Sequence, residues 1–219
     1  MAKKINEAVE SINVEIPELN IGYFEVTIIG DSPLIEHAWS DKAKQMMLDK
    51  QMKKATSGRE AKDPFMDFCD SLYWLDGKPE NPTMEDVRNA RFGFPTVAFK
   101  AAAVDAGYQS GILAKKTTAR GAFHIVGEMA EIEGTPEMRE DMVRIGMGTA
   151  DIRYRGEFKK WSTTLTIRYN KNAISDEQII NLINVGGFAC GVGEWRPGKD
   201  GSYGMFHVAR EEELKKLNG

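Results

Sequence analysis

The glycine-rich segment from Gly187 to Gly204 constrains the fold of this 219-residue chain more than any other stretch. It contains six glycines. Glycine has no side chain to fill a core, but it tolerates unusual backbone dihedrals and lets another segment approach closely. Before this segment, Ser175 and Gln178 have the spacing of a capping box that opens an amphipathic helix. Gly186 and Gly187 are expected to end that helix, and a short strand is expected after the glycines.

Hydrophobic periodicity predicts the other elements. Phe24, Val26 and Ile28 alternate with polar residues, which is typical of a half-buried strand. Ser40 can cap the first helix, and Gly107 is expected to end the second. The predicted strands cover 23–29, 122–132, 164–169 and 205–208, and the predicted helices cover 41–54, 97–106 and 176–185. This order predicts an α+β fold with a ferredoxin-like, RRM-like βαββαβ core, an antiparallel sheet with helices on one face, and inserted lobes.

Length and composition predict one domain after a short arm. Residues 1–20 are expected to form a flexible N-terminal arm, and residues 21–219 a single domain with insertions at about 59–95 and 134–161. The two cysteines are too few for a disulfide framework. No run is long enough to cross a bilayer, and no apolar leader follows the N-terminal charges. A cytoplasmic protein without a membrane partner is expected.

Charge is unevenly distributed along the chain, although the net charge is only −4. Seven basic residues stand against two acids in 42–62, and six against one in 153–171. Six acids stand against one base in 128–141. The molecule is therefore expected to be electrostatically two-sided, although each run alone also fits a solvated face. Three methionines of the first helix, Met46, Met47 and Met52, are interpreted as core residues.

The glycine loop does not match either common nucleotide-binding pattern. Arg196 stands where a dinucleotide fingerprint needs glycine, and a helix precedes the loop. Asp200 replaces the hydroxyl residue of a P-loop. The loop can instead lie against a sugar-phosphate chain with its N–H groups directed outward, while Trp195 stacks on a base and Lys199 supplies charge. The alternative is a glycine-rich turn that closes the last hairpin, with Trp195 packed beneath it.

The pattern G-x-G-x-x-R-P-G-x-x-G-x-Y-G-x-F, which begins at Gly191 and precedes the terminal strand, resembles the glycine-rich signature of the RAMP superfamily. More narrowly, it resembles the repeated backbone subunit of CRISPR effector complexes and phage-encoded relatives. The resemblance implies subunits that polymerise along guide RNA. It also implies that the glycine loop and the basic helix of residues 41–54 lie against the nucleic-acid backbone.

These observations predict a sequence-tolerant protein that binds single-stranded RNA or DNA, forms a homo-oligomer or filament on the strand, and is not an enzyme. Tyr154 and Tyr203 are further candidates for stacking on bases. The predicted contact residues are Lys42, Lys44, Lys50, Lys53, Lys54, Lys115, Lys116, Arg153, Arg155, Lys159, Lys160, Trp161, Gly191, Gly193, Trp195, Arg196 and Lys199.

Catalytic and metal-binding patterns are weak. The three histidines are far apart in sequence, and none has a metal ligand three or four residues away, so neither a metal site nor a cofactor is expected. Two alternatives stay open. One is a RAMP-type endoribonuclease, in which His37 pairs with a lysine or Asp31 acts through a metal. The structural alternative for Asp31 is an Asx turn. The other is an anti-defence module that docks on a protein.

Overall fold

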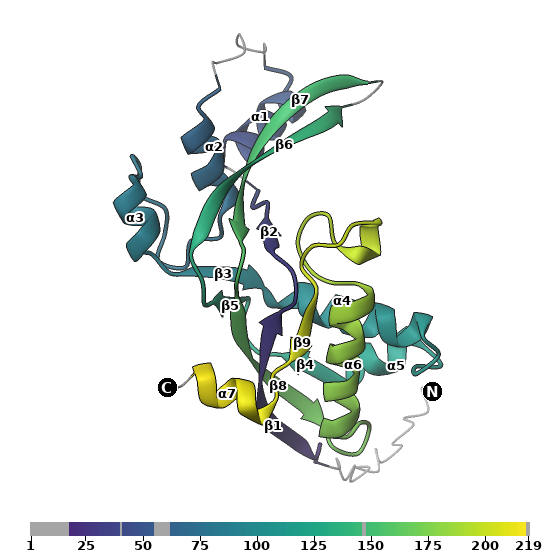
Figure 1. The fold of residues 1–219 in the computed structure, drawn as a ribbon. Coiled ribbons are helices and arrows are strands. Elements are labelled where there is room, and N and C mark those ends of the chain that lie inside the picture. The colour runs from purple at the N-terminus through teal and green to yellow at the C-terminus, as the bar shows by residue number, and fades with distance from the viewer. Residues whose placement is uncertain (1–17, 40, 55–61, 146–147, 218–219) are drawn as a thin grey trace, which may run out of the picture.

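The computed structural model describes residues 18–39, 41–54, 62–145 and 148–217 (Figure 1). Most of the predicted arm, residues 1–17, lies outside the described residues. In chain order the elements are β1 (Ile21–Gly30), β2 (Leu34–Glu36), α1 (Asp41–Gln51), α2 (Pro64–Ser71), α3 (Met84–Asn89), β3 (Phe92–Pro95), α4 (Thr96–Gln109), α5 (Lys116–Ala122), β4 (Phe123–Ile125), β5 (Met129–Ile132), β6 (Pro136–Ile145), β7 (Thr149–Phe158), β8 (Ser162–Asn170), α6 (Asp176–Ala189), the short 3₁₀ turn η1 (Pro197–Lys199), β9 (Phe206–Val208) and α7 (Glu211–Leu217).

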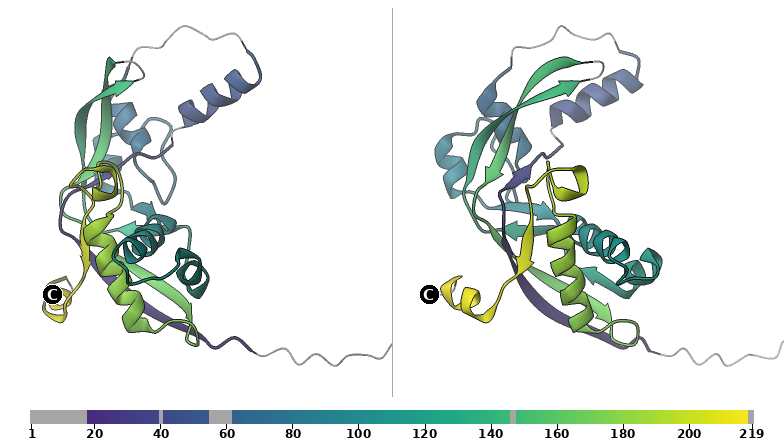
Figure 2. Two further views of the ribbon diagram at one scale, coloured as in Figure 1. Left: turned by 90° about the vertical axis from the view of Figure 1, so that its right-hand side faces the viewer. Right: turned by 45° about the vertical axis from the view of Figure 1, so that its right-hand side comes forward.

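The core is a four-stranded antiparallel sheet in the order β4-β8-β1-β9. Helices α4 and α6 pack side by side on one face of this sheet (Figure 2). Along the chain the core elements follow the order β1, α4, β4, β8, α6, β9, which is β-α-β-β-α-β. The core is ferredoxin-like. The α+β prediction and the antiparallel sheet are confirmed.

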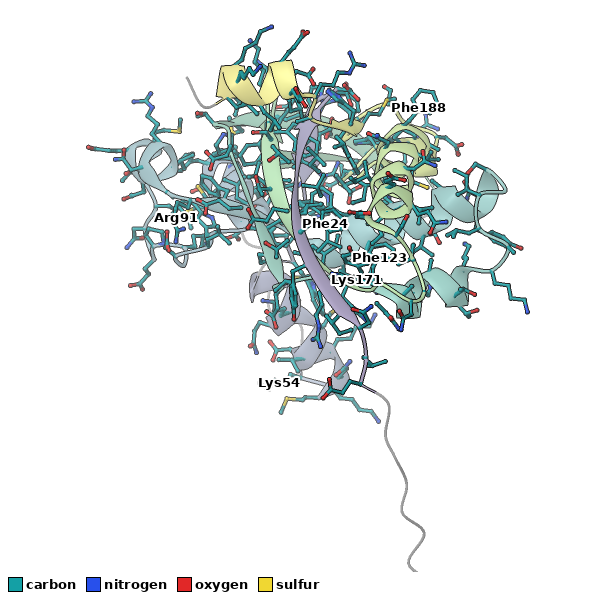
Figure 3. All side chains as sticks on the ribbon, turned by 90° about the horizontal axis from the view of Figure 1, so that it is seen from below. Phe24, Lys54, Arg91, Phe123, Lys171 and Phe188 are labelled. Atoms are coloured by element: carbon teal, nitrogen blue, oxygen red, sulfur yellow. The ribbon has the colours of Figure 1, made fainter. Side chains whose placement is uncertain are left out.

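The two faces of β1 differ as its sequence pattern predicts. Val26 and Ile28 are buried in the core, while Tyr23 on the opposite face is 63% exposed. Phe24, on the helix side, packs edge to face on Tyr169 of β8 at a centroid distance of 5.5 Å (Figure 3). Tyr23, Glu25 and Thr164 are exposed on the other face, so that face of the sheet is open.

Helices α4 and α6 continue through glycines that the sequence analysis expected to end them. The capping box at Ser175 opens α6 as predicted, but the helix runs to Ala189. A Cβ at Gly186 would lie 2.7 Å from Ala103 of α4, and a Cβ at Gly107 would lie 2.4 Å from Leu182 of α6. The glycines are therefore needed for close helix packing and do not act as stop signals.

The single strand expected over 122–132 is two strands in different sheets. Gly127 adopts a φ of 87°, a left-handed conformation that breaks the extended chain. Before the break, β4 pairs with β8 of the core sheet. After it, β5 pairs with β3.

A second layer extends away from the core (Figure 1). Strands β2, β7 and β6 form an antiparallel sheet in that order, and α2 packs on β7. Asp63 caps α2 by accepting hydrogen bonds from the backbone N–H groups of Phe65 and Met66. The ranges 59–95 and 134–161 contain α2, α3, β3 and the β6–β7 hairpin, while β2 and α1 also lie between the first two core elements. Within the described residues, no helix is long and apolar enough to span a bilayer.

Candidate nucleic-acid interface

The glycine loop is folded tightly on itself and on the start of β2. A Cβ at Gly204 would lie 1.7 Å from the carbonyl oxygen of Val192, and a Cβ at Gly201 would lie 1.7 Å from that of Trp195. The N–H of Val192 donates to Gly204 O, and the N–H of Glu194 donates to Ile35 O. Most of the loop's N–H groups thus serve the fold, and the expectation that they point outward is wrong for these positions.

A hollow of about 320 Å³ lies between the glycine loop and one face of α4. Its apolar wall comes from Phe94 and Pro95 together with alanines of α4, whose small side chains leave the space open. Its polar groups come from four different segments of the chain. The lining residues are His37, Tyr73, Phe94, Pro95, Ala98, Ala101, Ala102, Asp105, Gln109, Cys190, Gly191, Val192, Gly193, Glu194, Arg196 and Gly198.

A histidine–carboxylate pair lies at this hollow. His37 Nδ1 is 3.2 Å from Glu194 Oε1. The hydrogen bond from His37 lowers the pKa of Glu194, against the raising effect of burial. Burial raises the pKa of the Tyr73 phenol, and the charges of Glu36 and Glu194 add to the effect. His37 pairs with a carboxylate, so the expected pairing with a lysine is not what this structure contains.

The loop residues predicted to contact nucleic acid have different environments. Trp195 is 42% exposed, with a φ of 52°, and Lys199 is exposed. The guanidinium of Arg196 donates to the carbonyl oxygen of Gly193 at 3.0 Å, so it braces the loop. Gly191 and Gly193, with φ values of 61° and 80°, line the hollow from the backbone side. Trp195 and Lys199 therefore remain available to a partner.

Helix α1, which ends at Gln51, and the residues that follow it to Lys54 present both lysines and methionines to solvent. Lys44, Lys50, Lys53 and Lys54 are exposed, and Lys54 pairs with Asp49 at 3.1 Å. Lys42 belongs to α1, but its side chain lies outside the described part of the chain. The interpretation of the methionines as core residues is wrong: Met46 is 67% and Met52 is 65% exposed, with Met47 and Leu48 beside them.

The charges of the β6–β7 hairpin largely neutralise each other. Strands β6 and β7 pair antiparallel, and this register brings the acidic run next to the basic one. Arg139 lies 2.8 Å from both Asp141 and Glu157, Lys159 lies 2.5 Å from Glu137, and Arg153 lies 2.8 Å from Asp151. The expected two-sided charge distribution is therefore wrong for this hairpin.

Two residues expected to contact nucleic acid are buried. Arg155 pairs with buried Asp141 at 3.2 Å. Trp161 is 4% exposed, donates from Nε1 to the carbonyl oxygen of Ser32, and packs on Phe206. Their assignment as contact residues is corrected, because neither side chain reaches the surface in this structure. Lys160 is exposed.

The remaining candidates are partly engaged within the chain. Lys115 is exposed at the start of α5, whereas Lys116 pairs with Asp105 at 2.9 Å and lies over the ring of Tyr108. Tyr203 is covered by the guanidinium of Arg139 at 4.6 Å from its ring centroid. Tyr154 is half-buried.

Asp31 and the other histidines do not form a metal site. Asp31 Oδ1 lies 2.6 Å from His207 Nδ1, and Glu213 lies on the other side of that ring. His124 contacts Lys100. Among the residues that the structure describes, no three side chains of the metal-binding types are grouped closely enough to hold an ion.

Sequence reasoning missed Tyr73 and Asp105 as parts of the hollow. Tyr73 follows α2, and Asp105 lies on α4 among alanines. No local pattern marks either residue, because the hollow is assembled from segments that are distant in sequence. The alanine-rich composition of α4 was the available signal, since it indicates a helix face that another group can approach closely.

Comparisons with solved structures find similar chains. One belongs to the cryo-EM structure of the Type III-B Cmr-beta bound to cognate target RNA, with 12% identity and a TM-score of 0.47, covering 87% of this chain and 60% of that one. The crystal structure of Cmr6 from Pyrococcus furiosus gives 10% identity and a TM-score of 0.43, covering 88% and 100%. A CRISPR RNA-guided surveillance complex gives 10% identity and 0.35, covering 84% and 66%.

This chain is similar in fold to these solved chains. It spans about 60% of the length of the Cmr-beta chain. At these identities the likeness concerns the fold, which the strand order β4-β8-β1-β9 establishes independently. No protein-family model matches the chain, and no curated protein matches it in sequence.

Proposed function

We propose that this protein is a sequence-tolerant binder of single-stranded RNA or DNA that is not an enzyme. In this proposal it is a cytoplasmic, CRISPR-related or phage-encoded protein that assembles as a homo-oligomer or filament along the strand. Lysines of α1 contact phosphates, and Trp195 at the glycine loop stacks on a base.

The observation that supports the proposal is that the segment leading into α1 and the glycine loop line the same hollow. His37, which lies just after β2 and four residues before α1, lines the hollow together with the glycine loop. The segment that leads into the basic helix therefore contacts the glycine loop, which carries the exposed Trp195. Cations beside an exposed aromatic ring are the combination that binds single strands without sequence preference.

Lys50 and Lys53 are the cations best suited to this role. Both are exposed, and neither has a carboxylate within 4.0 Å among the described residues. Lys54 is less suited because Asp49 already neutralises it.

Fluorescence anisotropy tests the proposal. A labelled single strand of about 30 nucleotides, as RNA and as DNA, is titrated over a series of salt concentrations. The Lys50→Ala/Lys53→Ala variant is expected to bind more weakly and to reduce the slope of log K against log salt by about 1.4, or roughly 0.7 per lost phosphate contact. The matched control is Lys78→Ala/Arg91→Ala, which removes two cations that pair with Asp70 and Asp76. Wild-type protein that binds neither strand at low salt would overturn the proposal.

One observation favours the endoribonuclease alternative: His37 pairs with Glu194 beside a hollow. An imidazole held by a carboxylate can transfer protons. Incubation of labelled RNA with wild-type protein and with His37→Ala, each with and without a chelator, separates the two functions. Intact RNA supports binding alone, whereas cleavage that depends on His37 supports the enzyme.

A further inference from the structure

A row of three polar side chains crosses the open face of the core sheet. Tyr23 of β1 lies opposite Arg168 of β8, and Arg168 lies opposite His124 of β4. Directly opposed residues on one face of an antiparallel pair have Cβ atoms about 4.5–5.5 Å apart. All three residues are exposed. A phenol ring, a guanidinium and an imidazole are therefore neighbours on one surface.

The row continues round the β4 edge of the sheet to further cations. Lys100 of α4 places its Nζ 3.2 Å from His124 Nδ1 and donates to the carbonyl oxygen of Arg120 at 2.8 Å. Burial lowers the pKa of His124, and the charges of Lys100 and Arg168 lower it further. Burial, followed by the charge of Arg120, also lowers the pKa of Lys100. These groups repel one another in the isolated chain.

Among the described residues, the cations of this cluster have no acidic partner. Within the described part of the chain, no carboxylate lies within 4.0 Å of Lys100, Arg120 or Arg168. On this face of the sheet, β1 carries the acidic residue Glu25, which lies opposite Thr166. The β6–β7 hairpin is different, because its arginines are paired with carboxylates. An external anion is the natural partner of a cation cluster that the fold leaves unpaired.

The floor beside the row is flat and weakly polar. Thr27 and Thr164 hydrogen-bond to each other through their hydroxyl groups at 3.0 Å, and Thr166 is the next residue of β8 on this face. The ring of Tyr23 is accessible from the solvent side, since the residue is 63% exposed. A planar ligand can therefore lie against this ring while its charged groups reach the cations.

We propose that this open face is a second nucleic-acid contact surface, on which Tyr23 stacks on a base and Arg168, with Lys100 and Arg120, contacts phosphates. Tyr23 and Arg168 lie on the sheet face opposite α6, Lys100 of α4 reaches His124 at the β4 edge, and the surface shares no residue with α1 or the glycine loop. The inference rests on the proposed function in that the chain must bind single strands. It adds a second contact, on the face of the core sheet that the helices leave open.

Affinity measurements with three single variants test the surface. Tyr23→Ala is expected to weaken single-strand binding about fivefold, the lower range for loss of one stacked base, while Tyr23→Phe binds as wild type. Arg168→Ala is expected to weaken binding and to reduce its salt dependence. Thr135→Ala is the matched control, since it changes an exposed residue outside this face without removing a ring or a charge. Circular dichroism checks that each variant is folded.

Photocrosslinking locates the contact directly. Strands that carry 4-thiouridine are irradiated with the full chain, and the crosslinked peptides are identified by mass spectrometry. Crosslinks in the peptides of Tyr23 or Arg168 that persist in Lys50→Ala/Lys53→Ala support the second surface. Normal affinity in Tyr23→Ala and Arg168→Ala, with crosslinks only at α1 or the glycine loop, overturns the second surface and leaves the proposed function standing. Absence of any binding by wild-type protein overturns both.

Discussion

Gly186 of α6 lies directly against Ala103 of α4: a Cβ on the glycine would be 2.7 Å from both the Cα and the amide nitrogen of Ala103. No side chain can occupy that space unless a helix moves. This contact sets the distance between the two helices that cover the core sheet, and the alanine face of α4 that lines the hollow is positioned with it.

Gly186→Ala is expected to destabilise the protein by about 1–3 kcal/mol, because overpacking forces backbone shifts. Gly121→Ala in α5 is the control, since its Cβ would meet nothing within 4 Å. This control is expected to be neutral or to raise stability by up to about 1 kcal/mol, because alanine restricts the unfolded chain. Urea denaturation measures both, and equal stabilities of the two variants would contradict the close contact.

Arg155→Ala is expected to lower the free energy of unfolding by about 1.5–3 kcal/mol, because buried Asp141 loses one charge-assisted hydrogen bond and keeps its pair with Arg139. The folded variant should bind single strands with the same affinity as wild-type protein, as measured by anisotropy. Lys159→Ala, which removes an exposed ion pair, should have little effect on stability. A binding defect in folded Arg155→Ala would restore this residue as a contact.

Met46→Gln/Met52→Gln is expected to leave the free energy of unfolding within about 0.5 kcal/mol of wild type, because both side chains are exposed. Leu34→Ala, which removes a fully buried side chain, should cost about 2–5 kcal/mol. Thermal denaturation compares the two. A large loss in the methionine variant would show that α1 packs against the protein in solution.

Glu36 gives the stability a distinct pH dependence. Burial raises its pKa well above the ordinary value, against the lowering effect of the hydrogen bond that it accepts from the Tyr73 N–H. The folded state therefore favours the neutral acid. The contribution of Glu36 to the free energy of unfolding is fully present below its unfolded-state pKa of about 4.3. It is lost as the pH rises towards its pKa in the folded state.

Glu36→Gln removes this titration. Relative to the variant, wild-type protein is expected to lose up to about 1.4 kcal/mol per pH unit between these two pKa values. Urea denaturation of both proteins from pH 4 to pH 8 measures the difference. Parallel stability profiles would show that Glu36 is ionised in the folded protein.

Local patterns were sufficient for the elements of the core. Alternation predicted β1 and β8, and the capping box at Ser175 predicted the start of α6, because these signals depend on residues two to four positions apart. The order of the elements then predicted the ferredoxin-like core. Exposure of Lys50, Lys53, Trp195 and Lys199, which the binding prediction required, also followed from local composition.

The sequence by itself therefore determined the core topology and the residue types offered for binding, whereas the tertiary structure decided which of those residues reach solvent. Pairing of β6 with β7 neutralised the basic run, and this depends on a register that joins Asp141 to Arg153. Trp161 is buried because its indole N–H donates to Ser32, 129 positions away. Close packing against α4 is also the reason that α6 continues through Gly186. Each outcome depends on contacts between segments that are distant in sequence, and local hydrophobic periodicity does not predict such contacts.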